Sequence, residues 1–303
     1  MKALPLSLAV ALAIGLSAPA VPAARAADAP AASTPAAPAW VARSNAFSQI
    51  LLKAQAPFAP EEASFFGIPG YDDQVFDLKP KVGERFRAAM AQAKTELAAK
   101  LAVEQDPNVR QDLQILIDAA SRNIENSTLN EQYMLPWADV GQNVFTGLQA
   151  LLSDQTPPER RAHALARLQR YAGMTADTTP LVQLAKDRYA ERLGDASLTR
   201  PSKMEVEQAL ANSDTYIKGI DDLFAQYKIE GAQPALDALG KQLRDYAAWT
   251  RSDVLPKARD DAKLPAPVYA FQLKQMGIDI DPKLLMQRAE VEFMESRAAM
   301  RQL

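Results

Sequence analysis

The sequence has no cysteine and a single histidine, His163, among its 303 residues. Without cysteine the chain has no disulfide, no thiolate metal ligand and no thiol nucleophile. One imidazole excludes zinc sites that need two histidines, including the His-Glu-x-x-His helix. A Ser-His-Asp arrangement would have His163 as its one candidate base. We therefore predict no catalytic, cofactor-binding or metal-binding residue in this chain.

Glycine is scarce, at 12 residues, and basic residues are not in excess, with 34 Lys and Arg against 37 Asp and Glu. Few glycines in an alanine-rich chain favour helix over a turn-rich β-protein. Proteins that bind nucleic acid usually carry a basic excess, so nucleic acid is not expected as a partner. Apolar residues make up 48% of the chain, which is enough for a folded core.

The N-terminal apolar run, Leu6–Ala18, has 13 residues and is too short to cross a bilayer of about 30 Å as a helix. Lys2 precedes it, and Ala24-Arg25-Ala26 follows as a small-x-small cleavage pattern. We expect residues 1–26 to be a secretory signal peptide; an uncleaved anchor is the alternative. No cysteine follows for a lipid anchor, so the predicted location is periplasmic or secreted, with no membrane span after cleavage.

Residues 27–39 form an Ala/Pro-rich segment, in which ten of 13 residues are alanine or proline. This composition offers nothing to bury, so we expect a disordered or extended linker there. The folded domain is expected over residues 40–303.

Helix-start signals occur at four places in this domain. Asp106-Pro107 and Asp281-Pro282 put an N-cap before a proline at the first helical position. Thr156–Glu159 and Ser202–Glu205 have the capping-box pattern. Apolar residues follow at helical spacing, for example in the stripes Val82, Phe86, Met90, Ala93, Leu97, Leu101 and Val109, Leu113, Leu116, Ala120, Ile124. The helix that opens at Thr156 is expected to run through Ala172 and to stop at Gly173. A later helix, with Leu236, Leu239, Leu243 and Tyr246 on its apolar face, is expected to end at Pro256.

Strand signals are confined to two short candidates, residues 71–76 and 268–271, both flanked by loop residues. Repeats of 30–45 residues and strict heptads are absent, which argues against a solenoid and a coiled coil. The predicted fold class is all-α, an irregular multi-helix array. The helix from Asp281 to Leu303 keeps its apolar period without a stop signal, which fits either a chain that ends in a helix or the front part of a longer protein.

His163 is expected to be solvated, because it lies about 200° around its helix from the apolar Leu165. The basic patch around it is interpreted as a solvated helix face, with phosphate binding as the alternative; it consists of Arg160, Arg161, Arg167 and Arg170. The adjacent acid pairs are interpreted as capping and surface residues, because neighbours on a helix diverge by about 100°; they are Glu61-Glu62, Asp72-Asp73, Asp221-Asp222 and Asp260-Asp261.

Four aromatic residues, Phe65, Phe66, Tyr71 and Phe76, lie in a segment rich in glycine and proline. We interpret it as a loop whose rings pack onto the helices. A rim that faces a substrate is the alternative.

This segment, FFGIPGYDDQVFDL at residues 65–78, resembles the N-terminal signature of the bacterial domain of unknown function 885 family. Phe66-Gly67, Gly70-Tyr71-Asp72 and Asp77 take the places of the family pattern, and Arg167-Leu168 fits its Arg-Leu step. Residues 268–300 resemble the family's Gly-hydrophobic-Asp turn and the long charged helix after it. The resemblance covers most of residues 45–303.

The resemblance implies an exported protein similar to zincin-type zinc metallopeptidases. The family's presumed metal helix lies downstream of the part matched here, so no zinc ligand can be assigned to any residue of this chain. The resemblance implies that this chain is the N-terminal helical region, inactive alone, and that it forms one wall of a cleft for a peptide substrate. Zinc is then expected only in the full-length family protein. The alternative is a complete periplasmic helical binding or adaptor protein without catalysis.

Overall fold

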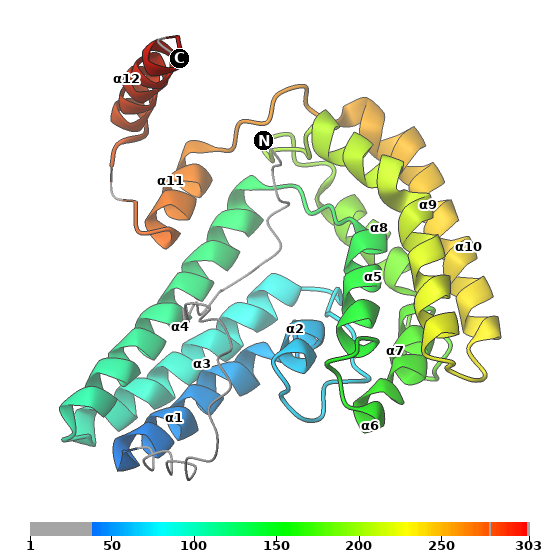
Figure 1. The fold of residues 1–303 in the computed structure, drawn as a ribbon, viewed down its shortest axis with the longest axis horizontal. Coiled ribbons are helices and arrows are strands. Elements are labelled where there is room, and N and C mark those ends of the chain that lie inside the picture. Colours follow the sequence, from blue (N-terminus) through cyan, green and yellow to red (C-terminus); the bar gives the residue numbers. More distant parts are fainter. Residues whose placement is uncertain (1–37, 279, 302–303) are drawn as a thin grey trace, which may run out of the picture.

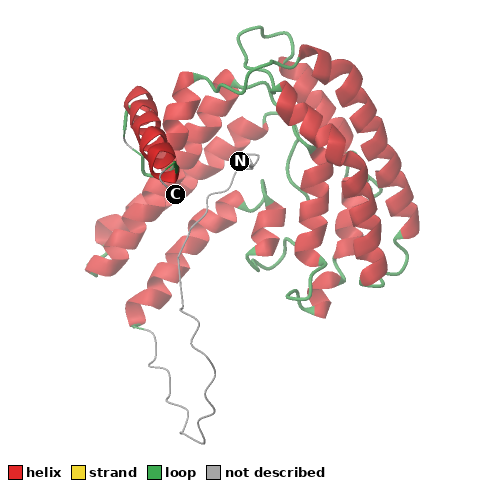
Figure 2. Ribbon diagram, turned by 45° about the horizontal axis from the view of Figure 1, so that its top comes forward, coloured by secondary structure: helices red, strands yellow, loops and turns green. Residues whose placement is uncertain are grey.

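The computed structural model describes residues 38–278 and 280–301. The predicted signal peptide and residues 27–37 of the predicted linker lie outside them. Over the described residues the fold is all-α, as predicted, and consists of helices joined by loops (Figure 2). Two isolated backbone bridges join loop segments, one between Met134 and Thr199 and the other between Ser202 and Arg259.

Three long helices form a first helical group: α1 (Ala39–Gln55), α3 (Val82–Val103) and α4 (Pro107–Tyr133). Their shared core contains the stripes predicted from the sequence, with Met90, Leu97, Val109, Leu113 and Ala120 fully buried. The apolar period therefore placed the buried faces of α3 and α4 correctly.

A second helical group follows along the chain (Figure 1). It consists of α5 (Val140–Leu151), α6 (Pro158–Arg161), α7 (Ala164–Tyr171), α8 (Leu181–Arg192), α9 (Lys203–Gln226) and α10 (Gln233–Trp249). Its main core is larger than that of the first group and is built from all these helices except α6. A smaller core beside it contains Leu135, Tyr189, Leu198, Val206 and Val254. The short helix α2 (Pro60–Phe65) packs against α5 and so connects the two groups.

Three of the four predicted helix starts are confirmed. Asp106 accepts a hydrogen bond from the amide of Asn108 at 3.0 Å, Asp281 from that of Lys283 at 2.8 Å, and Ser202 from that of Glu205 at 3.2 Å. These side chains satisfy backbone donors that the first helical turn leaves free.

The capping box predicted at Thr156 is wrong. The Thr156 hydroxyl donates to the carbonyl of Ala150 at 3.0 Å, and Pro157 is the N-cap residue without a side-chain hydrogen bond. The expected single helix is also divided into α6 and α7 by a turn at residues 162 and 163. Gly173 does follow its end, as predicted, with a φ of +68° that suits glycine.

The helix predicted to stop at Pro256 ends differently. α10 finishes at Trp249, and the backbone continues as a π-helix (Thr250–Val254) and a turn of 3-10 helix (Leu255–Lys257). Proline lacks the amide hydrogen that would bond four residues back and its ring crowds that carbonyl, so the wider π turn lets the chain reach Pro256 without a clash.

Neither strand candidate is a strand. Residues 71–76 form an irregular loop, and residues 268–271 belong to α11 (Ala266–Gln275), which packs against α4. After α11 the helix α12 (Pro282–Met300) stands apart (Figure 1), and none of its residues is buried. Within the described ranges, every helix is too short or too polar to cross a membrane.

Candidate functional site

The loop between α2 and α3, residues 66–81, is the most heavily tethered irregular segment that we describe. Val75, Phe76 and Leu78 pack against the core of the second helical group. Polar side chains of α2, α6 and α7 tether residues 71–76 of the loop, and we call this network the arginine clasp: Arg160, Arg167 and Arg170 with Glu61, Ser64, Asp72, Asp73 and Tyr171.

Asp72 is the centre of one half of the clasp. Its carboxylate accepts two hydrogen bonds from Arg160, at 2.8 and 2.7 Å, and one from the Ser64 hydroxyl at 2.6 Å. Arg160 also donates to the backbone carbonyl of Ser64. Burial alone would raise the pKa of Asp72, but the hydrogen bonds from Arg160 and Ser64 outweigh it and hold the pKa below its ordinary value of 3.8.

Arg167 is fully buried, with 0% of its surface exposed. It donates to the carbonyl of Gly147 in α5 at 2.7 Å and to the carbonyl of Tyr71 in the loop at 2.8 Å. The prediction of a solvated arginine was wrong for this residue. Arg167 lies on the buried side of α7 beside Leu168, and its acceptors come from distant parts of the chain.

Glu61 is the buried acid of the clasp. One carboxylate oxygen, Oε1, accepts from the amide of Phe76 at 2.9 Å and from the hydroxyl of Tyr171 at 2.7 Å. Burial raises the pKa of Glu61 above 4.5, although the Tyr171 hydrogen bond and the charge of Arg167 oppose this shift. A side chain at Gly147 would collide with Tyr171 and Glu61, so a glycine is needed there.

The remaining arginines of the basic patch are also engaged. Arg170 pairs with Asp73 at 3.4 Å, and Arg161 donates to the carbonyl of Thr156 while its guanidinium lies over the ring of Tyr227. The geometry therefore does not favour the phosphate-binding alternative, because these arginines are used to hold the protein together.

The acid pairs divide into two classes. Asp221-Asp222 and Asp260-Asp261 are exposed, as predicted. The pairs Glu61-Glu62 and Asp72-Asp73 are not surface pairs, because Glu61 and Asp72 are bound inside the clasp. His163 is exposed, which confirms the prediction made from its helical position.

The aromatic residues of the loop do not all pack inward as expected. Phe76 packs on the core, whereas Phe65 and Phe66 are 68% and 61% exposed and meet edge to face at 5.4 Å between ring centroids. The turn after them is fixed by Gly67, whose φ is +74°.

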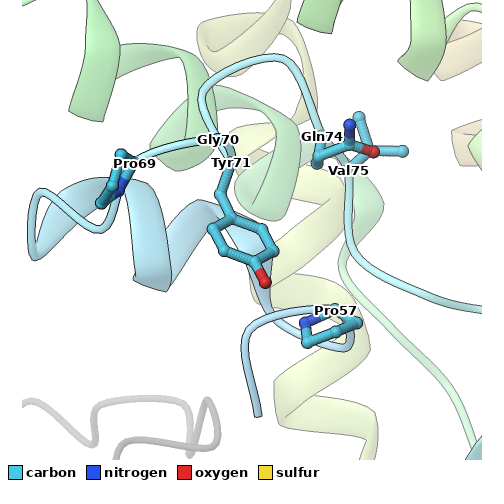
Figure 3. Close-up of a pocket in the computed structure, with 6 residues that line it drawn as sticks. All are labelled: Pro57, Pro69, Gly70, Tyr71, Gln74 and Val75. Atoms are coloured by element: carbon cyan, nitrogen blue, oxygen red, sulfur yellow. The ribbon is translucent and has the colours of Figure 1, made fainter. Parts of the chain in front are cut away.

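An open cavity of about 380 Å³ lies against this loop. Figure 3 shows the hydroxyl end of Tyr71 directed toward Pro57, with Pro69 and Gln74 on opposite sides of the ring in this view. Gly70 and Val75 complete the lining. Across residues 38–278 and 280–301, we find no three His, Cys, Asp or Glu side chains grouped to hold a metal ion.

The loop, the clasp and α11–α12 contain the residues on which the family resemblance rests. The family described as bacterial protein of unknown function, DUF885, matches residues 60–303. The chain belongs to this family. No curated protein matches it, and no solved structure does. In this DUF885 chain Arg167 of the Arg-Leu step and Asp72 of the Gly-Tyr-Asp turn are both clasp residues, so two parts of the signature meet in space.

Sequence reasoning missed Glu61 and Tyr171 as members of this network. Glu61 is one of two adjacent acids and Tyr171 one of 8 tyrosines, and 110 positions separate them in the chain. The available signal was the position of Glu61 just after Pro60, in the first turn of a short helix beside the family signature.

Proposed function

We propose that this DUF885 chain is the helical N-terminal region of an exported, zincin-like metallopeptidase-family protein. In this proposal it lacks the zinc-binding motif, is inactive alone, and supplies one wall of the cleft that receives a peptide. The export part rests on the signal-peptide pattern of residues 1–26, and the peptidase part on the resemblance of the family to zincins.

The observation that carries the proposal is the state of α12. Over its 19 residues it buries none, although its apolar side chains include Phe293, Met294 and Met300, which are 64%, 61% and 66% exposed. A helix that is rich in apolar residues is normally covered by other protein. The exposed apolar surface of α12 therefore supports the proposal that further parts of a full-length protein pack against this helix.

The shortage of zinc-ligating side chains supports the proposal that the chain lacks a zinc site and is inactive alone. A catalytic zinc needs three protein ligands, usually imidazoles together with a carboxylate. The chain has one histidine and no cysteine, and His163 is exposed on the turn between α6 and α7. The residues present do not fit a zinc centre, so the metal of the family would have to be bound by other residues of the full-length protein.

The proposal is tested on the purified chain and on its gene. After dialysis, metal analysis should find zinc far below one equivalent, and a mixed peptide library should remain uncleaved. The reading frame beyond codon 303 should encode a His-Glu metal helix. One-to-one zinc with turnover that His163→Ala abolishes would overturn the proposal. A stop codon within a few residues would favour a periplasmic binding or adaptor protein instead.

Export is tested separately. Cleavage after Ala26 should leave Ala27 as the first residue of the periplasmic product, and intact-mass spectrometry measures this directly. A soluble product that still carries Met1 would contradict the signal-peptide prediction.

A further inference from the structure

We propose that the cavity beside Tyr71 is a subsite for an extended, uncharged peptide segment that inserts an apolar side chain. This inference rests on the proposed function above, because it names the class of substrate that the cleft wall would contact.

The lining of the cavity determines the class of occupant. Pro57, Pro69 and Val75 contribute apolar surface, while Tyr71 and Gln74 contribute the polar side-chain groups, a hydroxyl and an amide (Figure 3). The lining contains no charged side chain. The lining offers a charged side chain no counter-charge, and contact with the apolar groups would remove part of its water, so the occupant should be neutral.

The two polar groups suit a peptide backbone. A tyrosine hydroxyl can donate to a peptide carbonyl, and a glutamine side chain can both donate to a carbonyl and accept from an amide. The Gln74 amide nitrogen lies 3.3 Å from the Asp73 carboxylate, which leaves its carbonyl oxygen as an acceptor. An extended segment exposes unpaired backbone groups of both kinds, whereas a helix does not.

The cavity is also preorganised. The carbonyl of Tyr71 is held by buried Arg167, and the next residue, Asp72, is held by Arg160 and Ser64. Ordering a loop before a ligand arrives lowers the entropic cost of binding. The clasp therefore holds the residues that form the cavity in one conformation.

Phe65, the last residue of α2, and Phe66, the first residue of the loop, add two exposed apolar side chains close in sequence to the cavity lining. Both precede the Gly67 turn that leads to Pro69. Adjacent exposed phenylalanines carry a risk of aggregation, and contact with an apolar part of the peptide would cover them.

The experiment uses the ¹⁵N-labelled chain and three capped peptides, acetyl-Gly-Ala-X-Ala-Gly-amide with X as leucine, aspartate or lysine. Amide shifts around Gly70 and Val75 report binding. The leucine peptide should bind about tenfold or more tightly than either charged peptide. Tyr71→Ala should weaken leucine-peptide binding by about tenfold or more, because an aromatic wall of the cavity is lost.

Gln74→Glu provides the sharper test, because it adds a negative charge at nearly constant volume. It should lower the affinity for the leucine peptide and raise the affinity for the lysine peptide, so that the difference between the two affinities becomes small or changes sign. Tyr269→Ala is the matched control, since Tyr269 is an exposed tyrosine of α11, at 40%, and should leave all three affinities unchanged. Circular dichroism confirms folding; Tyr71→Ala retains the backbone carbonyl that Arg167 binds.

Equal binding of the leucine and aspartate peptides, or unchanged binding in Tyr71→Ala, overturns the subsite. The absence of any amide chemical-shift change at about 10 mM peptide also overturns it, because that concentration would detect binding with a dissociation constant in the millimolar range. These results are independent of zinc and of catalysis. A full-length peptidase without this binding would reject the subsite alone, whereas binding in a family protein without a metal helix would reject the proposed function alone.

Discussion

The clasp places several charges where the protein has little water. Arg167 is fully buried, and the buried carboxylate of Glu61 provides its countercharge through Coulombic attraction without a direct ion pair. Burying charges is costly unless each is hydrogen-bonded and balanced. Removal of one partner therefore leaves the other uncompensated, which makes the network sensitive to single substitutions.

Arg167→Ala should lower the free energy of unfolding by about 3–5 kcal/mol, the usual cost of breaking a buried charge network. It deletes the bonds to Gly147 and Tyr71 and leaves Glu61 without its countercharge. Urea denaturation measures the change. His163→Ala, an exposed site four residues away, should cost under about 0.5 kcal/mol. Equal losses at the two positions would contradict the assignment of Arg167 to the core.

The two clasp acids should give opposite pH dependence. The folded pKa of Asp72 lies below 3.8, so its contribution to stability is present above that pH and is lost as the pH falls through the folded pKa. The folded pKa of Glu61 lies above 4.5, so its contribution is present below that pH and is lost as the pH rises through the folded pKa.

Thermal melts of the isosteric variants Asp72→Asn and Glu61→Gln, from acid to neutral pH, test this contrast. The deficit of Asp72→Asn relative to the parent should shrink as the pH falls below 3.8. Glu61→Gln should become more stable relative to the parent as the pH rises above 4.5. Parallel curves for the two variants would show that the acids do not differ in environment.

Residue-level prediction gave the right exposure for His163, although His163 lies on the turn between α6 and α7 and not within one continuous helix. It failed for Arg167, because the Tyr71 carbonyl that binds it lies 96 residues earlier in the chain. Arg167 adjoins the buried Leu168 in α7, but nothing in the local sequence indicates that hydrogen-bond acceptors for a guanidinium lie on that side of the helix. A buried arginine is recognisable only once the loop that covers it has been placed.

At the scale of the element, several helices end in the same way. After α2, α7 and α11, a glycine with positive φ follows the C-cap: Gly67, Gly173 and Gly277. Each donates to the carbonyl three residues back, and the next amide bonds five residues back, the pattern of the Schellman motif. α9 ends in the same way but with Lys228 in the glycine position, at a φ of +52°.

Lys228→Gly should therefore stabilise the protein, by up to about 1 kcal/mol. The left-handed conformation costs a side-chain-bearing residue about 1–2 kcal/mol, and part of this gain is offset by the greater freedom of glycine in the unfolded chain. Urea denaturation measures the change. Gly173→Ala is the reverse control and should destabilise, since its Cβ would lie 2.5 Å from Pro180. Destabilisation by Lys228→Gly would show that the lysine side chain contributes more than the backbone strain.

Helix starts were predictable where one side chain closes the first turn, as at Asp106 and Ser202. The Thr156 pattern failed because its hydroxyl bonds back to Ala150 at the end of α5, a competing acceptor that a capping motif does not include. The π-helix after Trp249 was also missed. Proline indicates that a helix is disturbed near Pro256 but does not specify which helical geometry relieves the clash.

At the scale of the whole molecule, each helical group has its own apolar core, and the groups are connected by α2, by the loop of residues 66–81 and by the segment after α4, where Leu135 packs with Tyr189 and Val206. Periodicity predicted the stripes inside each group, since those depend on local spacing. It did not predict which group the loop of residues 66–81 would join. That arrangement depends on long-range charge pairs, such as Arg160 with Asp72 across 88 residues.

The exposed apolar surface of α12 should make the isolated chain self-associate. Phe293 and Met300 remain largely in water in the described structure, and pairing these surfaces between copies would remove apolar area from water. Sedimentation velocity over a concentration series should show species heavier than the monomer. The double variant Phe293→Gln, Met300→Gln should weaken this association by about tenfold or more.

The same variant should leave the free energy of unfolding in urea nearly unchanged, within about 0.5 kcal/mol, because neither side chain is part of a core. Val103→Gln is the matched control: Val103 is an isolated apolar residue, 73% exposed at the end of α3, and its replacement should not affect association. A chain that stays monomeric throughout, or a double variant that melts much earlier, would mean that α12 packs against this domain in solution. In that case α12 would offer no free apolar surface to the rest of a full-length protein, and the main support for the proposed function would be removed.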